Sequence, residues 1–154
     1  MHIIINKVHY KGDDFMKKYF NIASLYAIFA IISGVFYREF TKWNSFTGQT
    51  TLSVCHLHLF ALGTIMFLII ALLCHTTNLE EKKSFHTFMK LYNIALVFMV
   101  IMFYIRGIVQ VLGMALSKAA NASLSGVAGI SHLLMTIAII MLFTILRKVD
   151  EKYS

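Results

Sequence analysis

Four apolar runs dominate this sequence, and each is long enough to cross a lipid bilayer. They cover residues 20–37, 52–74, 91–113 and 124–146. A membrane-spanning helix needs about 20 consecutive, mostly apolar residues. Short polar links separate the runs, and such links place consecutive helices side by side and antiparallel. The pattern therefore predicts an all-α integral membrane protein, built as an up-down four-helix bundle.

Composition supports a membrane protein and excludes the main alternatives. Hydrophobic residues make up 58% of the chain and charged residues 14%, and the mean hydropathy is +0.73. A soluble domain averages about 45–50% apolar and about 25% charged residues. Intrinsic disorder requires low hydrophobicity, so it is excluded as well. The chain contains no proline, which favours a few long helices.

The basic residues predict the orientation of the chain in the membrane. The formal net charge is +7, but these residues lie in the links, so we do not expect a nucleic-acid partner. Ten Lys and Arg residues flank the side that carries both termini, whereas the other side has only Arg38, Lys42 and Lys118. Segments rich in Lys and Arg stay in the cytoplasm. We therefore expect a multi-pass protein of the bacterial cytoplasmic membrane, with both termini cytoplasmic.

The first fifteen residues look unlike the rest of the chain. Residues 11–16 can be encoded by a string that contains a strong bacterial ribosome-binding sequence ahead of an ATG codon. We expect Met16 to be the true start and residues 1–15 to be a translated leader; the alternative is a short cytoplasmic tail. Residues 16–154 then form a single four-span membrane domain. Detection of a cellular peptide spanning Lys7 to Lys17 would exclude the leader.

Polar side chains within the spans gather in the half of the bundle away from the termini. They are His56 and His58 in the second run, Arg106 and Gln110 in the third, His132 in the fourth, and Arg38 and Glu39 at the end of the first. Ionisable groups in hydrocarbon cost several kcal/mol, so each needs a partner or a purpose. Their convergence from four helices on one level predicts a site.

A haem b held by two histidines is the interpretation that we favour for this level. Two neutral imidazoles on facing helices can ligate the iron inside an apolar bundle. His132 is the candidate ligand of the fourth run, and the second run offers His56 and His58. Residues two apart on a helix point about 200° apart, so only one of those two faces the centre. The other is an alternate ligand or lies beside the site.

Cations and small residues complete the predicted haem site. Arg106 and Arg38 are placed to meet the two propionates, and Gln110 lies one turn beyond Arg106 on the same face. Small residues around His132 leave room for a flat macrocycle, and Gly63 offers similar room on the second run. Such a protein would act in electron transfer, haem handling or gas sensing.

Other functions stay open at this point. The histidines can simply hydrogen-bond between helices, and Arg106 can pair with Glu39, in which case the cluster is structural. A small oligomeric transporter or channel, or an accessory membrane subunit, also suits four spans. The expected protein partners are accordingly a second copy of the chain or a redox partner. No Ser/His/Asp set and no paired carboxylates are visible, so we do not expect an enzyme acting by itself.

Three segments carry a resemblance to a known family. They are YREFTKWNSFTGQTTLSVCHLHLFALG, YIRGIVQVLG and LSGVAGISHLL. Together they resemble the domain-of-unknown-function family 2871, which comprises small four-span bacterial membrane proteins without an established activity. The resemblance runs from about Met16 to Lys148.

One of these segments has a second, wider similarity. HLHLFALG is similar to the histidine-bearing second helix of subunit I of haem–copper oxidases and nitric oxide reductases. There, a histidine on this helix ligates a low-spin haem, and a later helix supplies the second ligand. The similarity implies that His58 is the axial ligand, with His132 as its partner by depth. The chain has far fewer spans than that subunit and no recognisable copper histidines, so we do not expect oxygen or nitric oxide reduction.

Overall fold

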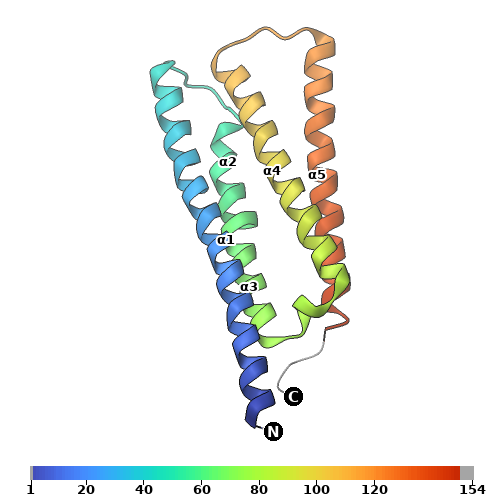
Figure 1. Cartoon of the computed structure of the whole chain (residues 1–154). Helices are drawn as coiled ribbons and strands as arrows, with labels where there is room; N and C mark the ends of the chain where they lie inside the picture. Colours follow the sequence, from blue (N-terminus) through green and yellow to red (C-terminus); the bar gives the residue numbers. More distant parts are fainter. Residues whose placement is uncertain (1, 150–154) are drawn as a thin grey trace.

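A computed structural model shows four long helical spans joined by short links (Figure 1). It describes the backbone of residues 2–149 and the side chains of residues 14–149. The spans are formed by α1 (His2–Trp43), by α2 (Leu52–His58), η1 (Leu59–Ile65) and α3 (Met66–Thr76) in continuous succession, by α4 (Lys83–Val111) and by α5 (Lys118–Leu146). A short 3₁₀ turn, η2 (Leu79–Glu81), precedes α4. The predicted all-α fold is confirmed, with no strand among the described residues.

The helices extend beyond the apolar runs that predicted them. All four meet the length and hydropathy of membrane spans, and the first and third cover Asp14–Trp43 and Lys83–Val111. Polar residues at the ends of a span continue the helix, because the backbone hydrogen bonds that a helix makes do not depend on whether the side chain is apolar. Specific caps mark where the helices begin and end. Gly113 takes a left-handed φ of 61° just after α4, and the Ser117 hydroxyl accepts a hydrogen bond from the Ala120 amide at the start of α5.

The spans alternate in direction, so α1 begins and α5 ends at the same end of the molecule (Figure 1). We call this the termini end, and the opposite end, which carries the links at 44–51 and 112–117, the loop end. Helix α1 packs against α2, η1 and α3; α2 packs against α4; and α4 packs against α5. The helices thus follow one another in space in their chain order.

The second span is not a uniform α-helix. Its middle segment, η1, is a π-helix, in which the chain takes a wider turn than in an α-helix. Gly63 lies in this segment directly beneath the Tyr26 ring of α1, and a Cβ at Gly63 would come within 2.6 Å of that ring. The Tyr92 hydroxyl of α4 donates a hydrogen bond to the Leu62 carbonyl at 2.8 Å. The wide turn is therefore held on both sides by tyrosines.

The densest packing lies toward the termini end. Its large side chains, all fully buried, are Phe67, Ile70, Phe85, Phe88 and Tyr92. Helix α5 joins this core only through its second half, whose buried residues are Ser131, Met135, Ala138, Leu142 and Ile145. None of residues 118–130 is buried, and in Figure 1 this half of α5 diverges from α4 toward the loop end. His132 lies where the packed and the unpacked halves of α5 meet.

Candidate functional site: two imidazoles around one phenylalanine

His58 is the last residue of α2, and the π-helix starts directly after it. Its Nδ1 atom lies 2.9 Å from the Val54 carbonyl oxygen, one turn earlier on the same helix. When Nδ1 carries the proton and donates it to this carbonyl, Nε2 is left with a free lone pair. The half-buried ring lies edge-on to the Phe103 ring of α4, with 4.7 Å between ring centroids.

His132 of α5 has the same local geometry. Its Nδ1 atom lies 2.9 Å from the Ala128 carbonyl oxygen, again one turn earlier on its own helix. Its ring also meets Phe103, with 5.7 Å between centroids. The His132 side chain is exposed because the neighbouring half of α5 stands away from the other helices.

The sequence analysis expected histidines from the second and fourth spans at one level, and the structure brings His58 and His132 to a single residue. That residue is Phe103, only 9% exposed, which sequence reasoning missed. Nothing in the sequence distinguishes it from the other twelve phenylalanines. We call His58 and His132 the imidazole pair. Both members have a backbone partner on Nδ1 and a shared aromatic neighbour.

His56 faces a different helix. Its side chain packs over Gly34 of α1, where a Cβ would lie 3.8 Å from the imidazole. Its Nδ1 atom is buried and has no hydrogen-bond partner among the described residues. The expected divergence of residues two apart on a helix therefore applies, with His58 toward α4 and His56 toward α1. The expectation that Gly63 offers room for a macrocycle is wrong, because the Tyr26 ring fills that space.

Arg106 lies one turn from Phe103 toward the loop end of α4. It donates a hydrogen bond to the Ser125 hydroxyl of α5 at 2.8 Å. This contact bridges the gap where the two helices diverge. The alternative pairing with Glu39 is wrong, since the only ion pair that Glu39 makes within residues 14–149 is with Arg38, at 3.6 Å. Within the part of the chain whose side chains are described, Arg106 therefore has a neutral partner and no carboxylate.

The other two predicted residues lie apart from the imidazole pair. The Gln110 side-chain oxygen accepts a hydrogen bond from the Thr51 amide at 2.8 Å and so ties α4 to the start of α2. Arg38 is 80% exposed on α1, a helix that packs against α2, η1 and α3. Arg106 is thus the cation that the fold brings toward His132, through its bond to Ser125.

A family model described as "Protein of unknown function (DUF2871)" matches residues 16–149. The chain belongs to this family. The match includes all four spans, the imidazole pair and Arg106. No curated protein and no solved structure matches the chain. The similarity of HLHLFALG to the haem-ligating helix of the haem–copper oxidases stays a prediction.

This DUF2871 protein has a second polar cluster at the termini end, which sequence reasoning missed. Glu80, in η2, is 5% exposed; it accepts a hydrogen bond from the Tyr19 hydroxyl and pairs with Lys18 at 3.3 Å. The Cys74 sulfur lies 3.9 Å from the same carboxylate. A glutamate in a polar link between two spans is usually exposed to solvent. Only the 3₁₀ turn, which folds the link back onto α1, buries it.

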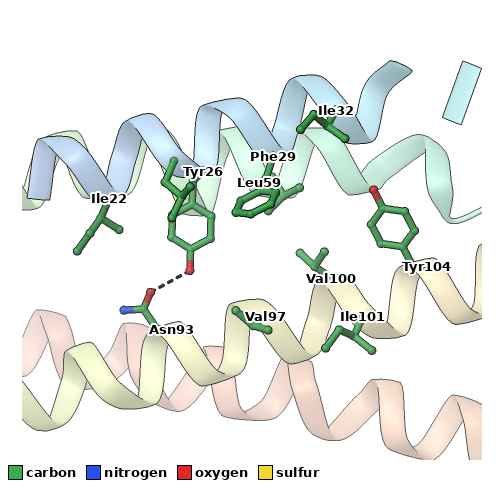
Figure 2. Close-up of a pocket in the computed structure, with 11 residues that line it drawn as sticks. Ile22, Tyr26, Phe29, Ile32, Leu59, Asn93, Val97, Val100, Ile101 and Tyr104 are labelled. Atoms are coloured by element: carbon green, nitrogen blue, oxygen red, sulfur yellow. Dashed lines mark hydrogen bonds between the residues drawn. The ribbon is translucent and has the colours of Figure 1, made fainter. Parts of the chain in front are cut away.

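A third feature is an apolar groove of about 560 Å³ between α1 and α4, with Leu59 as its floor (Figure 2). The Tyr26 hydroxyl donates to the side-chain amide oxygen of Asn93 at 2.8 Å, at one end of the groove. Tyr104 lies at the other end. The groove lies between α1 and α4, whereas the imidazole pair comes from α2 and α5.

Proposed function

We propose that this protein binds haem b in the membrane, with His58 and His132 as the axial ligands, and that it serves in electron transfer, haem handling or gas sensing. The observation that carries the proposal is the matching state of the two imidazoles. Each has its Nδ1 atom 2.9 Å from a carbonyl oxygen of its own helix, which leaves each Nε2 free to bind iron. Histidines that ligate metals in proteins almost always donate the other ring N–H in this way.

Two imidazoles are the full set of protein ligands for a low-spin haem, so the chain needs no third donor. Among residues 14–149, no group of three or more His, Cys, Asp or Glu side chains is arranged to hold a metal ion. This speaks against a protein-only site such as tetrahedral zinc in that part of the chain. A porphyrin supplies four of the iron ligands itself, so a haem would need only the imidazole pair from the chain.

The surroundings of the imidazole pair suit an apolar macrocycle. Phe103 is the side chain that both rings contact, so it would pack against the macrocycle or turn aside for it. On the α5 side, nothing lies within 4 Å of a Cβ built at Gly126 or Gly129. There is accordingly open space along α5 next to His132.

Arg106 suits the propionates. A guanidinium within the span of α4 that has only a neutral hydroxyl partner retains its capacity to bind a carboxylate. We assign this role to Arg106 alone, because Arg38 lies on α1 and already pairs with Glu39. We assign His56 no ligand role, since it packs on Gly34. When bound, haem b would supply one-electron redox chemistry, and a diatomic gas would bind only by displacing one of the two histidines.

The visible spectrum of the detergent-purified protein tests the proposal. We expect a sharp reduced-minus-oxidised α band, either as purified or after titration with haemin. His58→Ala and His132→Ala should each abolish the low-spin spectrum. His56→Ala is the matched control and should leave it nearly intact. A protein that stays colourless after haemin is added, or a pair of His58 and His132 variants with unchanged spectra, would overturn the proposal.

We further propose that both termini face the cytoplasm of a bacterial cell, because Lys and Arg favour the termini side ten to three. An alkaline phosphatase fusion after residue 149 should then be inactive. A fusion in the 112–117 link should be active. The reverse pattern would place the imidazole pair nearer the cytoplasmic surface and would exclude this orientation.

A further inference from the structure

The groove between α1 and α4 is built from one face of each helix (Figure 2). On α1 it is lined by residues such as Ile22, Tyr26 and Phe29, spaced three or four apart. The lining residues of α4 follow the same spacing, at Asn93, Val97, Val100 and Tyr104. Its volume of about 560 Å³ lies in the range of about 300–1,000 Å³ typical of small-molecule sites. The groove is therefore large enough for a ring with an apolar tail.

The depth of the groove restricts what can reach it. Val97 is the central residue of the Lys83–Val111 span, and Phe29 lies at the middle of Asp14–Trp43. At about 1.5 Å per residue, Val97 is about 21 Å from either end of its helix. Phospholipid head groups lie at the ends of the spans. Only an acyl chain or a molecule dissolved in the hydrocarbon interior can fill the groove.

The groove offers hydrogen-bonding capacity that an acyl chain cannot use. The Tyr104 hydroxyl, at one end of the groove, lies beside the Ser33 hydroxyl of α1. Ser33 is 1% exposed, and its oxygen has no hydrogen-bond partner within residues 14–149. A buried hydroxyl without a partner is costly in a medium without water. A ligand oxygen at this end of the groove would give the Tyr104 hydroxyl, which lines the groove, an acceptor.

We propose that the groove binds a lipid-soluble quinone or hydroquinone, with one ring oxygen at the Tyr104 hydroxyl and the apolar tail along α1 and α4. A quinone has the carbonyl oxygen that Tyr104 can bind, a flat ring that can pack against Phe29 and Tyr104, and a body that dissolves in hydrocarbon. The site goes beyond the proposed haem function and does not depend on it, because no member of the imidazole pair lines the groove.

Titration of the full-length purified protein with decylubiquinone tests this site. The melting temperature should rise and saturate with the quinone, since a ligand that binds only the folded state stabilises it. Val97→Trp fills the groove and should abolish the effect. Ile94→Trp is the matched control, because Ile94 is 62% exposed on the same helix but does not line the groove.

The oxygen contact is tested separately. Tyr104→Phe keeps the ring and removes one hydrogen bond, so the affinity for decylubiquinone should fall about three- to tenfold. Decylbenzene, which lacks the carbonyl oxygens, should bind more weakly than the quinone. His132→Ala should leave quinone binding unchanged, which separates this site from the haem proposal.

Two results would overturn the quinone site. The first is a Val97→Trp protein that responds to decylubiquinone as the unmodified protein does. The second is equal binding of decylbenzene and decylubiquinone, together with no effect of Tyr104→Phe. That result would mean that the groove binds an acyl chain and not a quinone. If Val97→Trp does not fold, the Tyr104→Phe and decylbenzene comparisons still decide between these outcomes.

Discussion

The two halves of α5 differ in how they pack, although they belong to one helix. Residues 131–146 present a buried residue every three or four positions, from Ser131 to Ile145, to a core of aromatic side chains. Residues 118–130 present none, and their contact with α4 includes the hydrogen bond between Arg106 and Ser125. Residues 124–130 belong to the same apolar run as residues 131–146. The comparison teaches that hydropathy places a helix in the bilayer, whereas side-chain size and spacing decide whether it packs.

Glycines show the same contrast at single positions. A Cβ at Gly107 would lie 2.8 Å from the backbone nitrogen of Leu52, and a Cβ at Gly63 would overlap the Tyr26 ring. A Cβ at Gly126 or Gly129 would meet nothing. In the first two places glycine permits close approach of helices, which is the main source of packing energy within a membrane. In residues 118–130, which we call the free half of α5, glycine has no such role within one copy of the chain.

The largest effect is expected from the packed core. Phe67→Ala removes a fully buried ring that stacks on Tyr26 at 5.4 Å between centroids. The cavity term of about 24 cal/mol per Å3, applied to about 100 Å3, gives about 2 kcal/mol, and lost contacts raise the expected total to about 2–4 kcal/mol. Reversible unfolding in mixed micelles measures the loss. Leu133→Ala, at a 59% exposed position of α5, is the control and should change little.

Gly107→Ala tests the close approach of α2 and α4. Its new methyl group would lie against the Leu52 backbone, which cannot move without shifting α2 as a whole. Overpacking of this kind costs about 1–3 kcal/mol. The free energy of unfolding in the same micelles should fall by that amount. A Gly107→Ala protein as stable as the unmodified one would show that α2 and α4 are less tightly apposed.

A smaller effect is expected at the buried carboxylate of the termini end. Glu80→Gln keeps one oxygen for the Tyr19 hydroxyl but removes the charge that faces Lys18. We expect the free energy of unfolding to fall by about 1–2 kcal/mol, because hydrogen bonds to charged groups are worth more than neutral ones. Glu81→Gln, at the exposed neighbouring position, should be neutral. Equal effects of the two substitutions would mean that the buried position of Glu80 carries no special stability.

Hydropathy predicted the four spans, and their alternating direction, together with the position of each polar residue along its span, predicted that the polar residues share one level. Both predictions rest on the polarity of each residue and on its position in the sequence, and neither depends on the tertiary fold. The level of His58 and His132 could be estimated, because about 1.5 Å of rise per residue converts sequence position into depth. The shared contact with Phe103 could not, because it depends on how each helix is rotated about its own axis.

Other features depend on tertiary contacts that have no local signal. Which of His56 and His58 faces α4 depends on how α2 packs between α1 and α4. The burial of Glu80 needed the 3₁₀ turn that returns the link to Tyr19. The residues of the π-helix at Leu59–Ile65 also suit an ordinary α-helix, so the sequence does not predict the wider turn. Its position coincides with the contacts that Gly63 and Leu62 make with two tyrosines.

The smallest effect is expected in the free half of α5, and this makes it the sharpest test of the contrast. Gly129→Leu adds a side chain where nothing lies within 4 Å among the described residues, so in the haem-free protein it displaces lipid alone. Substitutions at such exposed positions usually change stability by less than about 0.5 kcal/mol, and the gain in helix propensity over glycine acts in the favourable direction. The unfolding free energy and the particle mass in detergent should both match those of the unmodified protein. A loss as large as that of Gly107→Ala, together with a smaller particle, would mean that a second copy covers this face. The free half of α5 would then be a packed surface like the other, with its partner supplied by another chain.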